Sequence, residues 1–302
     1  MSARVKKPKS LGIWGNTDKP RFWELLPPIM DWAKDKKLAT FLTTRIHDNL
    51  PKSFTYDYHL IESADDFYQT DFLLTLGGDG TILSVTRAVG HRKTPILGIH
   101  LGELGFLAEV TVDDMFNRLD MVVTGDYSLD KRMILKAEII NSNGPHGPQI
   151  FYALNDFVID RGKSHRIITM QLSANDHHVA DYKADGLIIA TPTGSTAYSL
   201  SAGGPIVIPQ MNVMVASPVS PHTLSLRPIV LPSDQTLEVK FLDDGTDEIA
   251  FAVDGQVNEY LSPESKIFIQ KAPFEIRMIA FEDSNYFKTL SLKMGWGKRG
   301  ET

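Results

Sequence analysis

The segment with the clearest chemical meaning is a glycine-rich turn around a single carboxylate. An apolar run at residues 72–75 leads into Leu76-Gly77-Gly78-Asp79-Gly80-Thr81, and apolar residues resume at 82–85. This pattern is typical of a buried strand that turns sharply into a helix. Glycines at such a turn let the backbone approach a phosphate, and the helix N-terminus offers its N–H groups to it. We therefore interpret Gly77, Gly78, Gly80 and Thr81 as a phosphate cradle.

Asp79 is the residue in this turn that indicates a reaction. A carboxylate repels a phosphate unless it binds a bridging metal ion or accepts a proton from an attacking hydroxyl group. Both roles belong to phosphoryl transfer, and Asp79 is the candidate catalytic residue. The six residues alone also fit an ordinary tight turn with a solvated aspartate, because Asp-Gly pairs are common in turns.

Polar residues interrupt a second apolar run at 154–158, which contains Asn155 and Asp156. Burying these two side chains without partners would cost on the order of 1 to 3 kcal/mol each, so we expect them to have partners. A β-bulge with both side chains in water is the alternative. Arg161, Lys163 and Arg166 follow and could balance ligand phosphates, or they could form a solvated hairpin tip.

A run of small hydroxyl residues follows the apolar strand expected at 187–190. Residues 191–199 hold five serine or threonine hydroxyls together with Tyr198. A short helix is expected to begin near Thr196 and to end at Gly203-Gly204. Serine and threonine are preferred helix caps, but one cap uses fewer hydroxyls than these. We therefore interpret the loop as a binding site for a polyhydroxylated, phosphate-bearing ligand.

Two more loops are candidates for the same site. Leu104-Gly105-Phe106-Leu107 follows the strand expected at 95–99, and Phe106 is expected to line the same crevice as Asp79. Asp254-Gly255-Gln256 follows a strand and fits either a hairpin turn or a ligand contact. His177 and His178 lie among polar residues and are expected at the surface, since their spacing resembles no zinc site.

The elements that must position these residues divide the chain into two halves. In the first half, strands at 11–15, 39–42, 58–61, 72–76 and 95–99 alternate with helical segments, which predicts an α/β domain with a Rossmann-like parallel sheet. From residue 131 strand follows strand, which predicts an all-β, sandwich-like C-terminal domain. We expect domains at 1–129 and 130–284, with residues 285–302, which alternate only weakly, returning to the first domain.

Length and composition limit the classes of function. The 302 residues are enough for about two domains. The net charge of −6 argues against a nucleic-acid partner, and the lack of cysteine excludes disulfides and thiolate metal ligands. No apolar run approaches the ~18 residues of a membrane span, and no secretory signal is visible. A cytoplasmic protein without membrane contact is expected.

With these motifs in hand, the sequence resembles the NAD kinase family of bacteria from about residue 11 to its end. The string at 191–198, Thr-Pro-Thr-Gly-Ser-Thr-Ala-Tyr, is highly specific to that family, whereas the glycine-Asp loop is shared with lipid kinases and phosphofructokinases. The resemblance implies transfer of the terminal phosphoryl group of ATP or polyphosphate to the 2′-hydroxyl of the adenosine ribose of NAD, which gives NADP. It also implies a divalent metal cation, expected to be Mg²⁺, and a homodimer or homotetramer.

The resemblance also implies a role for individual residues. Asp79 would accept the proton of the 2′-hydroxyl, and Gly80 would touch the dinucleotide. Asn155 and Asp156 would hold the ribose and adenine end, while Lys183 and Asp185 would contact the nicotinamide half or a neighbouring subunit's ligand. The residues expected to close over the adenine and its ribose are Thr196, Ala197, Tyr198, Ser199, Leu200 and Ser201, and those expected to add further contacts are Phe106, Arg166 and Gln256.

Two positions depart from the family pattern. Asp156 stands where many members have Glu, which shortens the reach by one methylene, and Lys183 stands where Arg is frequent, which removes a bidentate fork.

Two other functions remain open. One is a lipid kinase of the diacylglycerol or sphingosine type, and the other is a non-catalytic NAD-binding sensor. Only a catalyst would depend on the Asp79 carboxylate.

Overall fold

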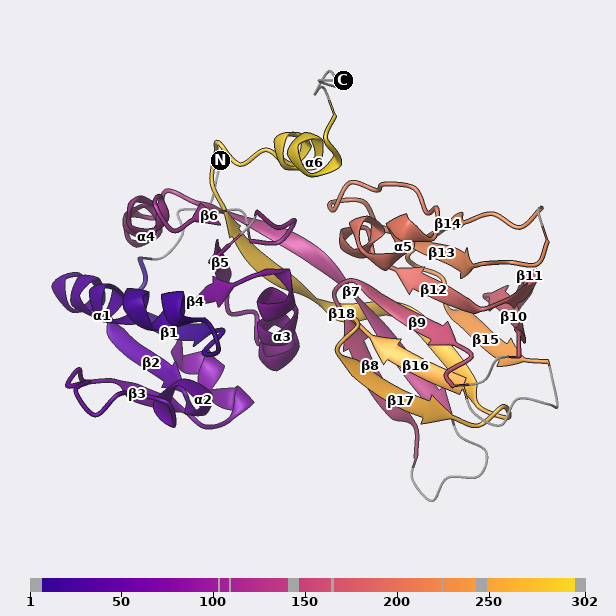
Figure 1. The fold of residues 1–302 in the computed structure, drawn as a ribbon, viewed down its shortest axis with the longest axis horizontal. Coiled ribbons are helices and arrows are strands. Elements are labelled where there is room, and N and C mark those ends of the chain that lie inside the picture. Colours follow the sequence, from indigo (N-terminus) through magenta and orange to yellow (C-terminus); the bar gives the residue numbers. More distant parts are fainter. Residues whose placement is uncertain are drawn as a thin grey trace. The chain divides into compact units, whose positions relative to one another are not determined.

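The computed structural model describes residues 7–102, 104–108, 110–140, 147–163, 166–223, 225–242 and 249–296. It consists of two units (Figure 1): the first unit is Met1–Lys131 with Ile276–Thr302, and the second unit is Arg132–Glu275. Strands β7 (Ser128–Ile140) and β18 (Lys266–Ala280) have residues in both units. Among the described residues, no helix combines the length and apolar character needed to cross a membrane.

The first unit is built on a parallel sheet, as the sequence predicts. The strands that belong to it alone are β1 (Ser10–Gly15), β2 (Ala39–Thr43), β3 (His59–Ile61), β4 (Phe72–Gly77), β5 (Ile96–His100) and β6 (Val110–Thr111). The order is β18-β5-β4-β1-β2-β3, with β6 on β5, and each of these pairs is parallel. The predicted α/β domain is therefore confirmed.

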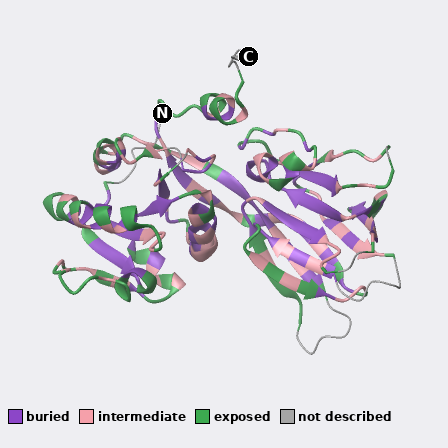
Figure 2. Cartoon of the chain, in the orientation of Figure 1, coloured by how far each residue is buried: buried purple, intermediate pink, exposed green. Residues whose placement is uncertain are grey.

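Helices separate these strands and supply much of the core. They are α1 (Pro20–Asp35), α2 (Thr44–His47), α3 (Asp79–Val89), α4 (Met115–Thr124) and α6 (Tyr286–Met294), with 3-10 turns η1 (Ala64–Gln69) and η2 (Gly90–Arg92). Every residue of β4 is buried (Figure 2), because helices cover both faces of a parallel sheet. The apolar side of α1, with Phe22, Leu26 and Ile29, packs into this core.

The second unit contains antiparallel sheets, as expected from its run of strands. Besides β7 and β18, its strands are β8 (Gln149–Ala153), β9 (Asp156–Asp160), β10 (Ile168–Ala174), β11 (His177–Ala184), β12 (Gly186–Ala190), β13 (Val213–Val219), β14 (Ile229–Pro232), β15 (Leu237–Phe241), β16 (Ile249–Val253) and β17 (Val257–Leu261). One sheet has the order β14-β13-β12-β9-β16-β17, and the other contains β11-β10-β15-β18 with β7 and β8.

Side chains from both sheets of the second unit meet in one core. Phe157 of β9 stacks on Phe251 of β16 with ring centroids 5.3 Å apart. Leu172 and Val239 of the other sheet belong to the same buried cluster. The predicted sandwich-like architecture is therefore confirmed. Short helical turns, η3 (Thr193–Thr196) and α5 (Tyr198–Ser201), follow β12 where the sequence predicts a single short helix.

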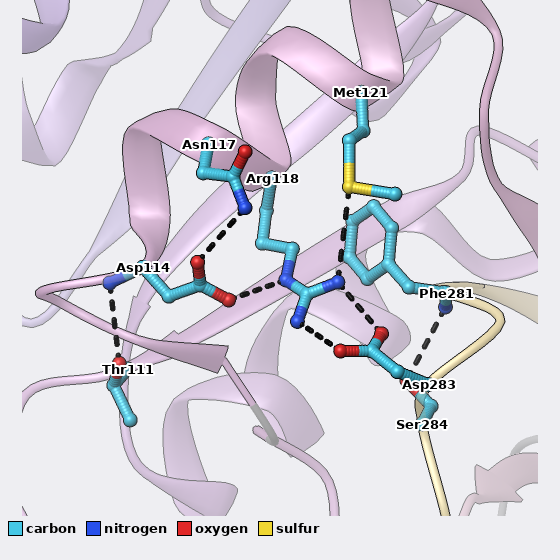
Figure 3. Close-up of polar contacts among 8 residues, drawn as sticks. All are labelled: Thr111, Asp114, Asn117, Arg118, Met121, Phe281, Asp283 and Ser284. Carbon is cyan, nitrogen blue, oxygen red and sulfur yellow. Dashed lines mark hydrogen bonds and ion pairs between the residues drawn. The ribbon is translucent and has the colours of Figure 1, made fainter.

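The segment after β18 packs against α4 through an arginine (Figure 3). The guanidinium of Arg118 donates to both carboxylate oxygens of Asp283, at 2.7 and 2.6 Å, and also to Asp114. It lies over the ring of Phe281 at 4.7 Å. Beyond this contact the chain forms α6, whose first turn is capped by the side chain of Asn285. The weak alternation in the sequence did not indicate this helix.

Candidate active site

The carboxyl ends of β1, β2, β3 and β4 surround a cavity of about 720 Å³ in the first unit. Strand β4 ends at Gly77 and α3 begins at Asp79, so that Gly78 alone makes the turn. Gly78, Gly80 and Thr81 line the cavity. These are residues of the predicted phosphate cradle, and they lie where an open parallel sheet usually binds its ligand.

The walls of this cavity combine an apolar surface with charged side chains of both signs. Trp14, Ile61 and Phe67 contribute apolar surface, and the indole N–H of Trp14 donates to the Ser84 hydroxyl at 3.2 Å. Lys19 and Arg45 line the same cavity with Asp18 and Glu62, and Arg45 pairs with Asp18 at 2.9 Å, so Lys19 is the cation left for a phosphate. Lys19 and Gly78 precede the first residues of α1 and α3, so two helix N-termini face the cavity. Helix N-termini and cations favour phosphate groups.

The carboxylate of Asp79 is bound by the loop that follows β5. Asp79 accepts the backbone N–H groups of Phe106 at 2.9 Å, Leu107 at 3.1 Å and Ala108 at 3.4 Å. Gly105 lies so close to this carboxylate that a Cβ atom at that position would overlap it. The structure therefore brings Asp79 and Phe106 together, and the loop fixes the direction of the Asp79 side chain.

Asp79 can still accept a further hydrogen. Its Oδ2 atom receives the Phe106 N–H, whereas Oδ1 receives those of Leu107 and Ala108. A carboxylate oxygen has two lone-pair positions, so Oδ2 keeps one for a hydroxyl proton. The side chain is half-buried. These contacts exclude the solvated aspartate of an ordinary turn.

In the second unit, Asp156 opens β9 and is only 3% exposed. Burial raises the pKa of its carboxyl to about 7, with a further rise from the Asp254 carboxylate, while the backbone N–H of Tyr198 lowers it. At neutral pH this carboxyl can therefore act as a hydrogen-bond donor or as an acceptor. The neighbouring Asn155 is half-buried. The water-exposed bulge considered for this pair is wrong for Asp156.

Most hydroxyls of the serine- and threonine-rich loop are bonded inside the protein. Thr191, Ser195 and Ser199 are 0% exposed. The Ser195 hydroxyl bonds to Pro192 and Val207, and that of Ser199 to Ser217 at 2.9 Å. The loop therefore uses the hydroxyls of Thr191, Ser195 and Ser199 to close itself, and the contact expected between Ser199 and the ligand stays a prediction. Tyr198 and Ser201 are exposed, and Thr196, Ala197 and Leu200 are half-buried.

The other predicted residues lie at or near the surface of the second unit. Lys183, Arg166 and Gln256 are exposed, and half-buried Asp185 faces Arg161 at 3.4 Å. Asp254 and Gly255 form the turn between β16 and β17, so the hairpin interpretation is confirmed for them. Sequence reasoning missed the Asp254 side chain, which is 7% exposed and binds backbone of residues 154–156. It also missed Trp14, Lys19 and Arg45, since nothing in their local pattern indicates a shared cavity.

Two family models match the chain over most of its length. Residues 11–127 match the model described as the ATP-NAD kinase N-terminal domain. Residues 154–281 match the ATP-NAD kinase C-terminal domain. The first match lies within the first unit, and the second covers the second unit from residue 154 together with residues 276–281 of the first unit.

Curated relatives and solved structures agree with these models. The NAD kinase of Geotalea daltonii is 37% identical over 96% of this chain and 100% of its own length. That of Gemmatimonas aurantiaca is 41% identical over 90% of this chain and 92% of its own. The fold is similar to yeast NADH kinase complexed with NADH, with a TM-score of 0.89 and 24% identity over 98% of this chain and 90% of that one. From the two family models and the near full-length relatives, we conclude that this chain belongs to the NAD kinase family.

Proposed function

We propose that this protein is an NAD kinase that transfers the terminal phosphoryl group of ATP to the 2′-hydroxyl of the adenosine ribose of NAD, giving NADP. Both halves of the chain match models of ATP-NAD kinase domains. The observation that carries the proposal is Asp79, whose carboxylate is held in one direction beside a glycine turn that opens into a cavity suited to phosphate. Phosphoryl transfer depends mainly on positioning and on charge neutralisation.

The phosphoryl donor belongs in the cavity of the first unit. Its phosphates would lie against Gly78, Gly80 and Thr81 near Lys19, and its base against Trp14 and Ile61. A cavity of about 720 Å³ is large enough for a nucleotide. The apolar wall favours ATP over inorganic polyphosphate, because only the nucleotide carries an aromatic ring to bury there.

Asp79 acts as the general base. Its Oδ2 accepts the proton of the 2′-hydroxyl while the ribose oxygen forms a bond to the γ-phosphorus of ATP. The bond between that phosphorus and the β,γ-bridging oxygen breaks, and ADP leaves. The three N–H groups of residues 106–108 hold the base in place during this step.

NAD is held by residues of both halves of the sequence. Asn155 and Asp156 bind the ribose and adenine end, and the exposed ring of Tyr198 offers a face to the adenine. Lys183 and Asp185 contact the nicotinamide half or the ligand of a neighbouring subunit. Further contacts come from Gly80, Phe106, Arg166, Gln256 and the segment 196–201. The domains expected from the sequence, residues 1–129 with 285–302 and residues 130–284, differ from the two compact units at residues 130–131 and 276–284, which belong to the first unit.

The divalent metal, expected to be Mg²⁺, fits the residues of this chain as an ion carried by the donor. The described residues contain no group of three or more His, Asp or Glu side chains that could hold a metal. Mg²⁺ commonly keeps several waters and binds substrate phosphates with only one or two protein carboxylates. When bound, it would neutralise charge on the phosphate oxygens of ATP.

The direct test measures NADP formation from NAD and ATP with Mg²⁺, using the purified wild type and Asp79→Asn. Asparagine keeps the shape but is a very weak base, and its amide oxygen can accept the loop N–H groups on one side only. We expect kcat to fall about 10²- to 10⁴-fold with little change in NAD affinity. As the matched contrast, Lys19→Met should raise KM for ATP and leave KM for NAD unchanged.

Other results would change the assignment. A wild type that phosphorylates a diacylglycerol and not NAD would make it a lipid kinase. Equal turnover of wild type and Asp79→Asn would show that Asp79 is not the general base. NAD binding by the wild type without any turnover would make the protein a sensor.

A further inference from the structure

Two residues, Asp254 and Thr191, bond the backbone of residues 154–156 through their side chains and their backbone N–H groups. The Asp254 carboxylate accepts three successive N–H groups, those of Leu154 at 3.1 Å, Asn155 at 2.7 Å and Asp156 at 3.2 Å. Thr191 donates its hydroxyl to the Leu154 carbonyl at 2.6 Å and its N–H to the Asn155 carbonyl at 2.8 Å. The Asp254 N–H donates to the Asp156 carbonyl at 3.0 Å. All six backbone polar groups of residues 154–156 thus have a partner in Asp254 or Thr191.

Asp254 can do this because of its backbone conformation. It directly follows β16, which pairs with β9 (Figure 1). Its φ of +51° is in the left-handed region, where aspartate is one of the few tolerated side chains. The carboxylate is thereby turned back onto the N–H groups at the start of β9. Hydrogen bonds to a charged acceptor are stronger than neutral ones, and Asp254 is 7% exposed.

Thr191 connects the same segment to the loop that carries Tyr198. Its hydroxyl donates to Leu154 and accepts the N–H of Gly194 at 3.0 Å. Gly194 lies so close to the Asn155 carbonyl that a Cβ atom would overlap it. Thr191 is 0% exposed. One buried hydroxyl therefore joins the Leu154 carbonyl to the first turn of η3.

We infer that Asp254 and Thr191 are positioning residues for NAD binding, which act through the backbone of residues 154–156. This inference rests on the proposed function, because it takes those two side chains as the ones that hold the ribose and adenine of NAD. Side chains in a binding site must stay within about 0.5 Å of their productive geometry. Loss of a supporting bond should therefore weaken NAD binding while the donor cavity and Asp79 stay intact.

Thr191 offers a matched pair of variants. Thr191→Val keeps the shape but removes the hydroxyl, and Thr191→Ser keeps the hydroxyl. We expect KM for NAD and the calorimetric Kd of NAD to rise about tenfold in Thr191→Val and to stay within about twofold of wild type in Thr191→Ser. KM for ATP should not change in either variant, and kcat should stay within about threefold. This split separates positioning from a general loss of folded enzyme, which lowers kcat alone.

Asp254→Asn tests the other partner and carries the experiment if Thr191→Val does not fold. An asparagine amide turns N–H groups toward the backbone N–H groups of residues 154–156, so KM for NAD should rise again by about tenfold or more. Asp176→Asn is the control. Asp176 also has a left-handed φ, +65°, in a turn between antiparallel strands, but it is exposed. This variant should match wild type.

The outcomes separate the inference from the function on which it rests. An active wild type with unchanged KM for NAD in Thr191→Val and in Asp254→Asn overturns the inference and leaves the kinase assignment standing. A fall in kcat and melting temperature with every KM unchanged also overturns it, because the two residues would then be purely structural. A wild type that neither binds nor phosphorylates NAD overturns both.

Discussion

Asp79 and Asp156 are two carboxyl groups in opposite surroundings. Asp79 is half-buried and accepts three backbone N–H groups, which suits a base that must stay in place while it takes up a proton. Asp156 is buried beside a second carboxylate, and its pKa is raised to about 7. Its protonation state therefore changes near neutral pH, and with it the stability of the second unit.

The raised pKa of Asp156 predicts how stability depends on pH. In the folded protein the group keeps its proton up to about pH 7, whereas an ordinary aspartate has a pKa of 3.8. The folded state thus binds more protons than the unfolded state between these values. Stability from this group is fully present below about pH 4 and falls as the pH rises through 7.

Asp156→Asn should remove this dependence, since its amide does not ionise. Urea unfolding at pH 5 and pH 8 measures the effect. The wild type should lose unfolding free energy between pH 5 and pH 8, and this loss should be smaller in the variant by on the order of 2 to 4 kcal/mol. Equal changes in both proteins would mean that Asp156 is ionised in the fold throughout this range.

At the scale of elements, function depends on the segments that leave the ends of the strands. The turn from β4 into α3, the loop after β5 and the loop after β12 carry most of the site residues, because strand ends are fixed by the sheet while loops present side chains and N–H groups.

The loop after β5 also borders a second, smaller pocket. Leu104 and Val110 line a pocket of about 250 Å³ together with Arg118, Phe281 and residues of α6.

Arg118 is expected to hold the segment after β18 on α4 (Figure 3). Arg118→Met keeps a long side chain over Phe281 but removes the bonds to Asp114 and Asp283. Because the Asp283 side chain is 65% exposed, the loss of unfolding free energy should be only about 1 kcal/mol. In Arg118→Met the segment after β18 should detach from α4 more often, so trypsin should cleave this variant after Lys288 faster than it cleaves the wild type.

Arg92→Met is the matched control for Arg118→Met. Arg92 is also an arginine of the first unit, paired with Asp65 at 2.8 Å and with a similarly buried side chain. Its loss should leave the rate of cleavage after Lys288 unchanged. If both variants cleave alike, general destabilisation explains the result and Arg118 holds no particular segment.

At the scale of the whole molecule, we propose a homodimer or homotetramer that works in the cytoplasm. Strand β8 pairs with β7 at an edge of its sheet and exposes Ile150 and Tyr152, which are 50% and 36% exposed. Apolar side chains on an edge strand favour pairing with another chain. Light scattering of the purified protein should therefore give at least twice the mass of one chain.

A charge on this edge should weaken the association. Ile150→Lys should shift the mass toward one chain at micromolar concentration. Val230→Lys, on the edge strand β14 and 44% exposed in wild type, is the control and should leave the mass unchanged. A monomeric wild type would exclude the proposal, and dissociation by Val230→Lys alone would move the interface to β14.

The sequence by itself was sufficient to predict three features: the alternation of strands and helices in the first half, the run of strands in the second half, and the glycine turn at Asp79. These features arise from apolar periodicity and from backbone freedom, which are properties of neighbouring residues. Helix α6 escaped prediction because its apolar residues follow no clear period. The string at 191–198 identified the family, but not the use of its hydroxyls.

Only the tertiary structure decided which groups meet. The N–H groups of residues 106–108 reach Asp79 across 27 to 29 positions of sequence, and Asp254 reaches residues 154–156 across 98 to 100. Such contacts depend on strand order and register, which bring distant segments together. Thr191 is a further example. Its hydroxyl was expected to contact a ligand, but the residue is 0% exposed and the hydroxyl bonds the Leu154 carbonyl instead.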